Sequence, residues 1–137
     1  MTTKNAEQKP ITRGTYALIL HLSRAQTICI GARGEFKFPR GHYLYIGSAM
    51  NGLTARLARH LRSEKKLRWH IDYFLQHAQI KEVWTHQGNE RFECVWARAA
   101  LAMPNARVIV PRFGASDCDC ATHLVYFAKR LPGFSVR

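Results

Sequence analysis

The stretch GHYLYIGSA, Gly41–Ala49, decides the fold because aromatic and aliphatic side chains alternate along it and small residues follow. Tyr43 and Tyr45 fall on one face, and the two aliphatic residues between and after them fall on the other. This alternation predicts a strand over 42–47. A helical pattern begins a few residues later, so we expect Gly47 to end the strand and to let the backbone turn sharply.

Two further strands are predicted before this stretch. GTYALILHL, Gly14–Leu22, carries apolar residues on both of its faces, which is typical of a central strand that is covered on two sides. QTICIG, 26–31, is a second strand, and the short link between the two favours a hairpin.

A helical period follows the quoted stretch. Leu53, Leu57 and Leu61 recur at every fourth position, which predicts a helix over 51–66 with Asn51 as its N-cap. Asn89 is expected to cap a later helix. The remaining elements that we predict are helices over 69–78 and 89–103 and strands over 80–87, 107–110 and 121–129.

These elements form one mixed α/β domain, which suits a chain of 137 residues. We place the domain at 14–133, between a flexible basic N-terminal tail at 1–13 and a C-terminal tail at 134–137. No run approaches the roughly 18 apolar residues of a membrane span, and no apolar signal core precedes the first strand. We therefore expect a cytoplasmic protein with no membrane contact.

The charge is strongly positive, with 21 lysines and arginines against 9 acidic residues and a formal net charge of +12. Such an excess concentrates polyanions around the protein, and nucleic acid is the commonest of them. We expect a nucleic-acid partner, DNA rather than RNA. The alternatives are a basic protein that merely stays soluble and a subunit of an acidic complex.

Two polar side chains border the apolar stripe of the helix predicted over 51–66. At about 100° per residue, Arg56 and His60 lie one turn apart beside the leucines. Arg59 and Arg62 lie closer to the solvent face. A guanidinium at the edge of the core suits a phosphate, because its forked donors match two oxygens. The alternative is that both side chains simply cover the rim of the core.

Glu93 presents a carboxylate on a small, apolar helix face. This carboxylate needs a cation, a donor or an exit to solvent, because burying an unpaired charge is costly. Mg²⁺ or Mn²⁺ would serve, since both prefer hard oxygen ligands. Glu90 lies in the same sector and is the second candidate ligand. The alternative is that Glu93 occupies the first turn because the helix dipole favours an acid there.

Tyr16 and Tyr45 lie on two predicted strands, and pairing of these strands would bring their hydroxyls together. A phenol can position or deprotonate an attacking water if a metal ion or an arginine lowers its pKa. The alternative is a pair of core tyrosines whose hydroxyls reach solvent.

The four cysteines are expected to be free thiols in a reducing compartment. We interpret Cys29 and Cys94 as small buried residues. Cys118, Cys120 and His123 lie close together in CDCATH, but zinc takes four ligands and this tract offers three at an unusual spacing. A neighbouring aspartate or a distant residue would have to complete the set. We therefore expect a tight turn with buried thiols there rather than a zinc site.

Several short motifs occur in one fixed order: GTY at 14–16, YIG at 45–47, Arg56 and His60 in the next helix, and Glu93 in a later helix. With this order and spacing the chain resembles the GIY-YIG nuclease superfamily from Gly14 to its end, with Thr15 in place of isoleucine. The segments FPRGHYLYIGSA, RLARHLR, WHIDYFL and SDCDCATHL are similar to the small Uri-type branch, DUF123, which also occurs fused to DNA glycosylases.

The resemblance implies an α+β fold in which helices flank a three-stranded antiparallel sheet, with extra strand and loop elements at the C-terminus. It also implies a metal-dependent endonuclease that hydrolyses phosphodiester bonds in DNA during repair or recombination. Branched, damaged and single-stranded DNA are the candidate substrates. The alternatives are a non-catalytic nucleic-acid-binding module and a subunit of a repair complex.

By motif position, Tyr16 and Tyr45 would stand near the attacking water, with one of them acting as or supporting the general base. Arg56 would hold the scissile phosphate, and His60 would assist proton transfer or orient a tyrosine. Glu93 would hold one Mg²⁺ or Mn²⁺ ion that neutralises the leaving oxygen.

Four further residues are assigned to substrate binding. Gly47 would admit the phosphate close to the main chain, and Ser48 would donate a hydrogen bond to it. The other two are Lys37 and His70. Asp72, near His70, is interpreted mainly as a structural residue that caps its helix or pairs with Arg68 or His70.

Overall fold

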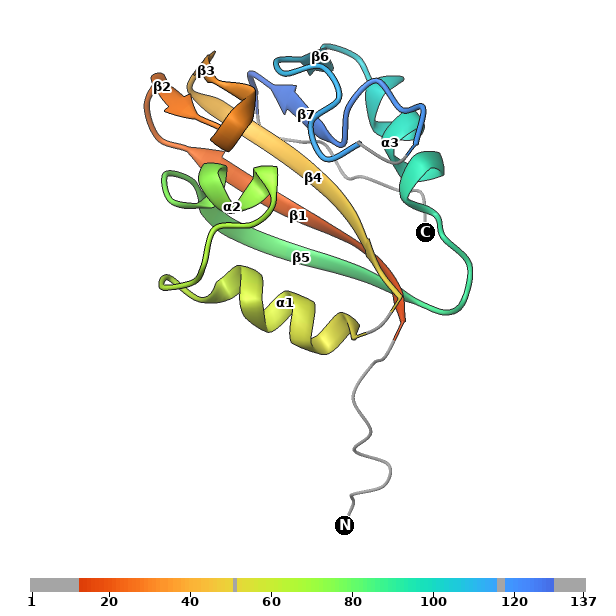
Figure 1. Cartoon of the computed structure of the whole chain (residues 1–137). Helices are drawn as coiled ribbons and strands as arrows, with labels where there is room; N and C mark the ends of the chain where they lie inside the picture. The colour runs from red at the N-terminus through yellow and green to blue at the C-terminus, as the bar shows by residue number, and fades with distance from the viewer. Residues whose placement is uncertain (1–12, 51, 116–117, 130–137) are drawn as a thin grey trace.

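The computed structural model of this protein describes residues 13–50, 52–115 and 118–129, and its core is one antiparallel sheet (Figure 1). Among the described residues the sheet has five strands in the order β5-β1-β4-β7-β6. Its strands are β1 (Gly14–Leu22), β4 (Gly41–Ala49), β5 (Gln79–Gln87), β6 (Arg107–Val108) and β7 (Leu124–Phe127). Each pair of neighbours in this order is antiparallel.

The predicted sheet of three strands is therefore smaller than the five-stranded sheet of the described residues. The predicted C-terminal elements do not lie apart from the sheet but extend it, because β7 pairs with the free edge of β4 and β6 pairs with β7. All four residues of β7 are buried, so this strand belongs to the core. The predicted strand over 121–129 shortens to Leu124–Phe127, and that over 107–110 to two residues.

The predicted hairpin between the first two strands is wrong. Strand β2 (Gln26–Cys29) pairs with β3 (Glu35–Phe38), and the two form a separate small sheet. The reason is that both edges of β1 are already taken, one by β4 and the other by β5. A short 3₁₀ turn, η2 (Gly31–Arg33), connects β2 to β3. Cys29 is exposed on this hairpin, so its interpretation as a buried residue is also wrong.

The helices cover both faces of the sheet, as the apolar pattern of β1 predicts. Helices α1 (Leu53–Leu61) and α2 (His70–Leu75) lie on one side and α3 (Glu93–Leu101) lies on the other (Figure 1). Leu18 of β1 shares one buried cluster with residues of α1 and α2. Its neighbour Ala17 shares a second cluster with residues of α3. Alternate residues of one strand thus belong to two cores.

The helix ends differ from the predicted caps. Helix α3 begins at Glu93 rather than at Asn89, whose side chain instead accepts a hydrogen bond from the Arg13 guanidinium. Helix α1 ends at Leu61, because Arg62 is already extended. The predicted N-cap Asn51 lies outside the described residues.

Gly47 has a different role from the one that the sequence suggested. Strand β4 continues to Ala49, so Gly47 produces no turn. It is paired with Tyr16 across the β1–β4 ladder. A Cβ atom at Gly47 would lie 2.5 Å from Cζ and from the hydroxyl oxygen of Tyr16, a distance that Cβ atoms do not adopt. The missing side chain therefore makes the space in which the ring of Tyr16 lies.

We expect Gly47→Ala to destabilise the fold by about 1–3 kcal/mol, the usual cost of inserting a methyl group into a filled core. Chemical denaturation measures this cost. It should shrink when Tyr16→Ala is also present, because the ring that the methyl group displaces is then gone. An equal cost in both backgrounds would show that the Tyr16 ring is not the reason for the glycine.

Candidate active site

A polar cleft of about 450 Å³ opens at one end of β1 and β4, beside α1. This volume lies in the range of small-ligand sites. Its lining brings together seven of the residues that the sequence predicts as functional: Tyr16, Tyr45, Gly47, Ser48, Arg56, His70 and Glu93. They come from two strands and three helices, so the sheet pairing and the helix packing assemble the cleft.

Tyr16 and Tyr45 lie side by side at the base of the cleft, with their ring centroids 6.4 Å apart. The hydroxyl of Tyr16 is 2.7 Å from Nε2 of His60, which is buried behind it and does not line the cleft. His60 therefore fixes the orientation of the Tyr16 phenol. Of the two roles expected for His60, orienting a tyrosine is the one that this geometry favours.

The environment of these phenols opposes the loss of their protons. Burial raises the pKa of Tyr16 to about 12, although the positive charge of Arg56 acts in the opposite direction. Burial also raises the pKa of Tyr45 well above its ordinary value, and the proximity of Tyr16 adds to this. Both phenols are therefore protonated at neutral pH, and only an additional positive charge in the cleft would make either of them a base.

Arg56 is held at the mouth of the cleft by its aromatic and main-chain contacts. Its guanidinium carbon lies 4.4 Å from the centroid of the Trp69 ring, a cation–π distance. Its Nη1 donates to the main-chain oxygen of Ser48 over 3.2 Å. No salt bridge from Arg56 is found within the described part of the chain, so its charge is not neutralised by a carboxylate partner there.

The neighbouring Arg59 does have such a partner. Its two terminal nitrogens lie 2.8 and 2.9 Å from the two carboxylate oxygens of Asp72. Asp72 also accepts the main-chain N–H groups of Arg68 and Trp69, which fixes the start of α2. These contacts confirm a structural role for Asp72 and correct the placement of Arg59, which packs on Trp69 rather than facing solvent.

Glu93 enters the cleft from the first residue of α3. Strand β1 holds the start of α3 in place, because the main-chain N–H of Phe92 donates to the hydroxyl of Thr15 over 3.0 Å. Thr15, which replaces the isoleucine of the GIY motif, therefore anchors the helix that carries Glu93. Glu90 is exposed and is not part of the cleft lining, so Glu93 is the carboxylate that a bound substrate would meet.

The cleft suits a hard divalent cation bound by few protein ligands. Glu93 is one-fifth exposed and supplies a single carboxylate, and the neighbouring phenols supply oxygen atoms. Mg²⁺ is commonly held by one or two carboxylates together with water and substrate phosphate. These residues fit Mg²⁺ or Mn²⁺ in that manner.

His70 and Lys37, both predicted to bind substrate, lie in different places in the structure. His70 lines the cleft, and its Nδ1 accepts the main-chain N–H of Gly114, so the neutral ring carries its proton on Nε2. Lys37 lies on the β2–β3 hairpin, against a different hollow, and is not part of the cleft. The structure therefore does not bring Lys37 to the site.

One family model matches most of the chain. A model of the family described as domain of unknown function DUF123 matches residues 15–134. The chain belongs to the DUF123 family. This confirms the resemblance to the DUF123 branch of the GIY-YIG superfamily. No curated protein and no solved structure matches the chain. None of the helices in the described part of this DUF123 protein has the length and apolar character needed to cross a bilayer.

Arg68 and Arg91 also line the cleft of this DUF123 protein, although no motif or spacing in the sequence selects them. Both lie in irregular segments, where no helical or strand period assigns a side chain to a face. Together with Arg56 they give the cleft three guanidinium groups against the one carboxylate of Glu93. The predicted site therefore carries a local excess of positive charge.

We expect His60 to make the fold sensitive to acid. Burial, followed by the charge of Lys65, lowers the pKa of His60 from 6.5 to about 4. The unfolded chain then binds more protons between these pH values, so the free energy of unfolding falls as the pH drops from about 6.5 to about 4, by at most about 3 kcal/mol. His70, whose pKa burial also lowers, contributes in the same direction.

Urea denaturation at a series of pH values measures this effect. His60→Gln keeps a hydrogen-bonding side chain beside Tyr16 but cannot titrate, so it should flatten the loss of stability in acid. The matched control is His77→Gln, in the exposed turn after α2, which should leave the loss unchanged. The same acid sensitivity in His60→Gln and in the wild type would contradict the assignment.

Proposed function

We propose that this protein is a metal-dependent endonuclease that hydrolyses phosphodiester bonds in DNA. The observation that carries the proposal is the gathering of Tyr16, Tyr45, Arg56 and Glu93 around one basic cleft. A hydrolase for phosphodiesters needs a phosphate clamp, a group that positions water and a counter-charge for the leaving oxygen. Arg56 and the two tyrosines supply the first two, and Glu93 would hold the cation that supplies the third.

Arg56 is suited to bind the scissile phosphate. Its stacking on Trp69 and its bond to the Ser48 carbonyl fix the guanidinium plane while leaving other donors available. The Ser48 hydroxyl is buried beside it and has no hydrogen-bond partner among the described residues. A buried hydroxyl without a partner is costly, and a phosphate oxygen would satisfy it. Arg68 and Arg91 are placed to neutralise the adjoining phosphates.

Tyr16 and Tyr45 are proposed to hold the attacking water. The bond from Tyr16 to His60 limits rotation of the phenol, so its oxygen is presented in one orientation. Because the pKa of Tyr16 is about 12, its hydroxyl orients water as a neutral group until another positive charge arrives. Glu93 would hold Mg²⁺ or Mn²⁺, which supplies that charge and neutralises the leaving oxygen.

The competing proposal is a module that binds nucleic acid without cutting it, alone or as a subunit of a repair complex. The basic cleft alone would support binding. Two buried tyrosines, a buried histidine behind them and a carboxylate among arginines are not required for binding, and an acid in a phosphate site weakens it. This combination therefore favours the enzyme.

We expect Arg56→Ala to reduce cleavage of labelled DNA by at least about a hundredfold, the usual loss when one transition-state donor is removed. Binding of the same DNA should weaken by less than about tenfold, because the other arginines remain. The test uses linear, branched, nicked and single-stranded DNA with Mg²⁺, with Mn²⁺ and with a chelator.

The matched control is Arg62→Ala, which removes the same charge just after the end of α1, where Arg62 is exposed. It should cut as the wild type does. Equal cleavage by wild type and Arg56→Ala would refute the proposed site. Binding without cleavage of every substrate, with both metals, would support the non-catalytic module instead.

A further inference from the structure

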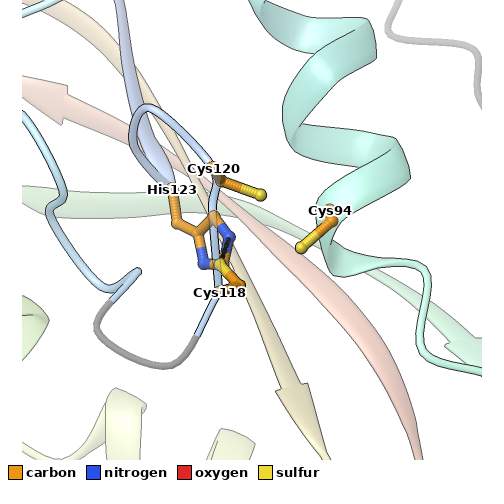
Figure 2. A group of neighbouring side chains, drawn as sticks. All are labelled: Cys94, Cys118, Cys120 and His123. Carbon is orange, nitrogen blue, oxygen red and sulfur yellow. Dashed lines mark hydrogen bonds between the residues drawn. The ribbon is translucent and has the colours of Figure 1, made fainter.

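Four soft metal ligands converge beside the start of α3. Cys94 points from α3 toward Cys118, Cys120 and His123, which lie on the loop that precedes β7 (Figure 2). One ligand atom from each of these residues lies within 4.8 Å of all the others. The sequence tract offered only three ligands, and the distant residue that completes the set is Cys94. Cys94 is partly exposed, so its interpretation as a buried apolar residue is wrong in that respect.

The dimensions are those of a zinc site before the ligands close on the ion. With Zn–S at about 2.3 Å and Zn–N at about 2.0 Å, a tetrahedron places two sulfurs about 3.8 Å apart and a sulfur and a nitrogen about 3.5 Å apart. Sγ of Cys118 and Nε2 of His123 are already 3.5 Å apart. No separation exceeds 4.8 Å, so the ligands need to contract by at most about 1 Å, which cysteine side-chain rotations provide.

We propose that Cys94, Cys118, Cys120 and His123 bind one structural Zn²⁺ ion. Three thiolates and one imidazole are a common ligand set for tetrahedral structural zinc. All four positions are filled by the protein, so no position remains open for a substrate or a reactive water. The site is therefore distinct in chemistry from the cleft, where oxygen ligands favour Mg²⁺ or Mn²⁺.

The contacts of His123 support this assignment. Its Nε2 faces the thiol of Cys118, while its Nδ1 lies 3.7 Å from the Oε2 atom of Glu93. A histidine that binds zinc through one nitrogen usually directs the other to a carboxylate or a carbonyl, which fixes the ring. Glu93 therefore lies between the two sites, and it precedes the zinc ligand Cys94 in the sequence.

The main chain at His123 shows what the ion would hold together. Its N–H donates to the oxygen of Phe113 over 2.8 Å, and its oxygen accepts the N–H of Ile46 on β4 over 3.0 Å. The loop before β7 is thus bonded to the sheet, whereas Cys94 belongs to α3, which shares a core cluster with this loop. Zinc would fasten the start of α3 to this loop and so fix the position of Glu93 in the wall of the cleft.

The test measures bound metal in the whole chain, purified under reducing conditions without added zinc or chelator. We expect about one zinc per chain in the wild type and close to none in Cys94→Ser. The matched control is Cys29→Ser, which removes the exposed cysteine of the β2–β3 hairpin and should keep about one zinc per chain. Removal of zinc by a strong chelator should lower the Tm of the wild type by at least about 5 °C.

A second measurement holds even if Cys94→Ser does not fold. Wild type expressed in cobalt-supplemented medium should show the visible absorption of Co²⁺ bound tetrahedrally by thiolates. Three results would each overturn the proposal. The first is wild type without bound metal or without that absorption, the second is wild type with iron in place of zinc, and the third is a disulfide between any two of the ligand cysteines. Because none of these readouts depends on DNA cleavage, the zinc site and the nuclease activity are tested independently of each other.

Discussion

The pairing of β1 with β4 is the constraint on which the rest of the structure depends. This register sets Tyr16 directly opposite Gly47 and Tyr45 opposite Leu18, so the two phenols lie diagonally on one face of the ladder. The Tyr16 ring occupies the space that Gly47 leaves empty, and its hydroxyl reaches His60 on α1. A shift of β4 by one residue against β1 would turn Tyr45 to the α3 side, so the two phenols would lie on opposite faces of the sheet.

Electrostatics then separates the arginines into two groups. Asp72 neutralises Arg59 and fixes the start of α2, which makes that pair part of the scaffold. Arg56 packs on the same Trp69 ring, and no carboxylate neutralises it within the described residues. The stacked, half-buried position of Arg56 strengthens its interaction with an anion. The proposed phosphate site thus follows from the pairing of the buried Asp72 with Arg59 rather than with Arg56.

The sequence predicted the parts that local periodicity controls. Residue patterns located β1, β4 and β5, the apolar residues on both sides of β1 predicted its two covered faces, and the leucine repeat located α1. Strand pairing is harder to predict from the sequence, because no residue near β2 indicates that both edges of β1 are occupied. Gly47 was assigned to a turn, although the group that requires it is a ring on another strand. Cys94, Arg68 and Arg91 were missed as site residues for the same reason: their roles come from side chains that only the tertiary fold brings near.

We propose that the cleft binds a DNA phosphate and a divalent cation at the same time. Crystals grown with Mn²⁺ and a phosphorothioate DNA that resists cleavage would show both, since manganese is located by its anomalous scattering. We expect an anomalous peak at the Glu93 carboxylate and a DNA phosphate against the Arg56 guanidinium. Manganese bound only elsewhere, or DNA bound on another surface with the cleft unchanged, would contradict it.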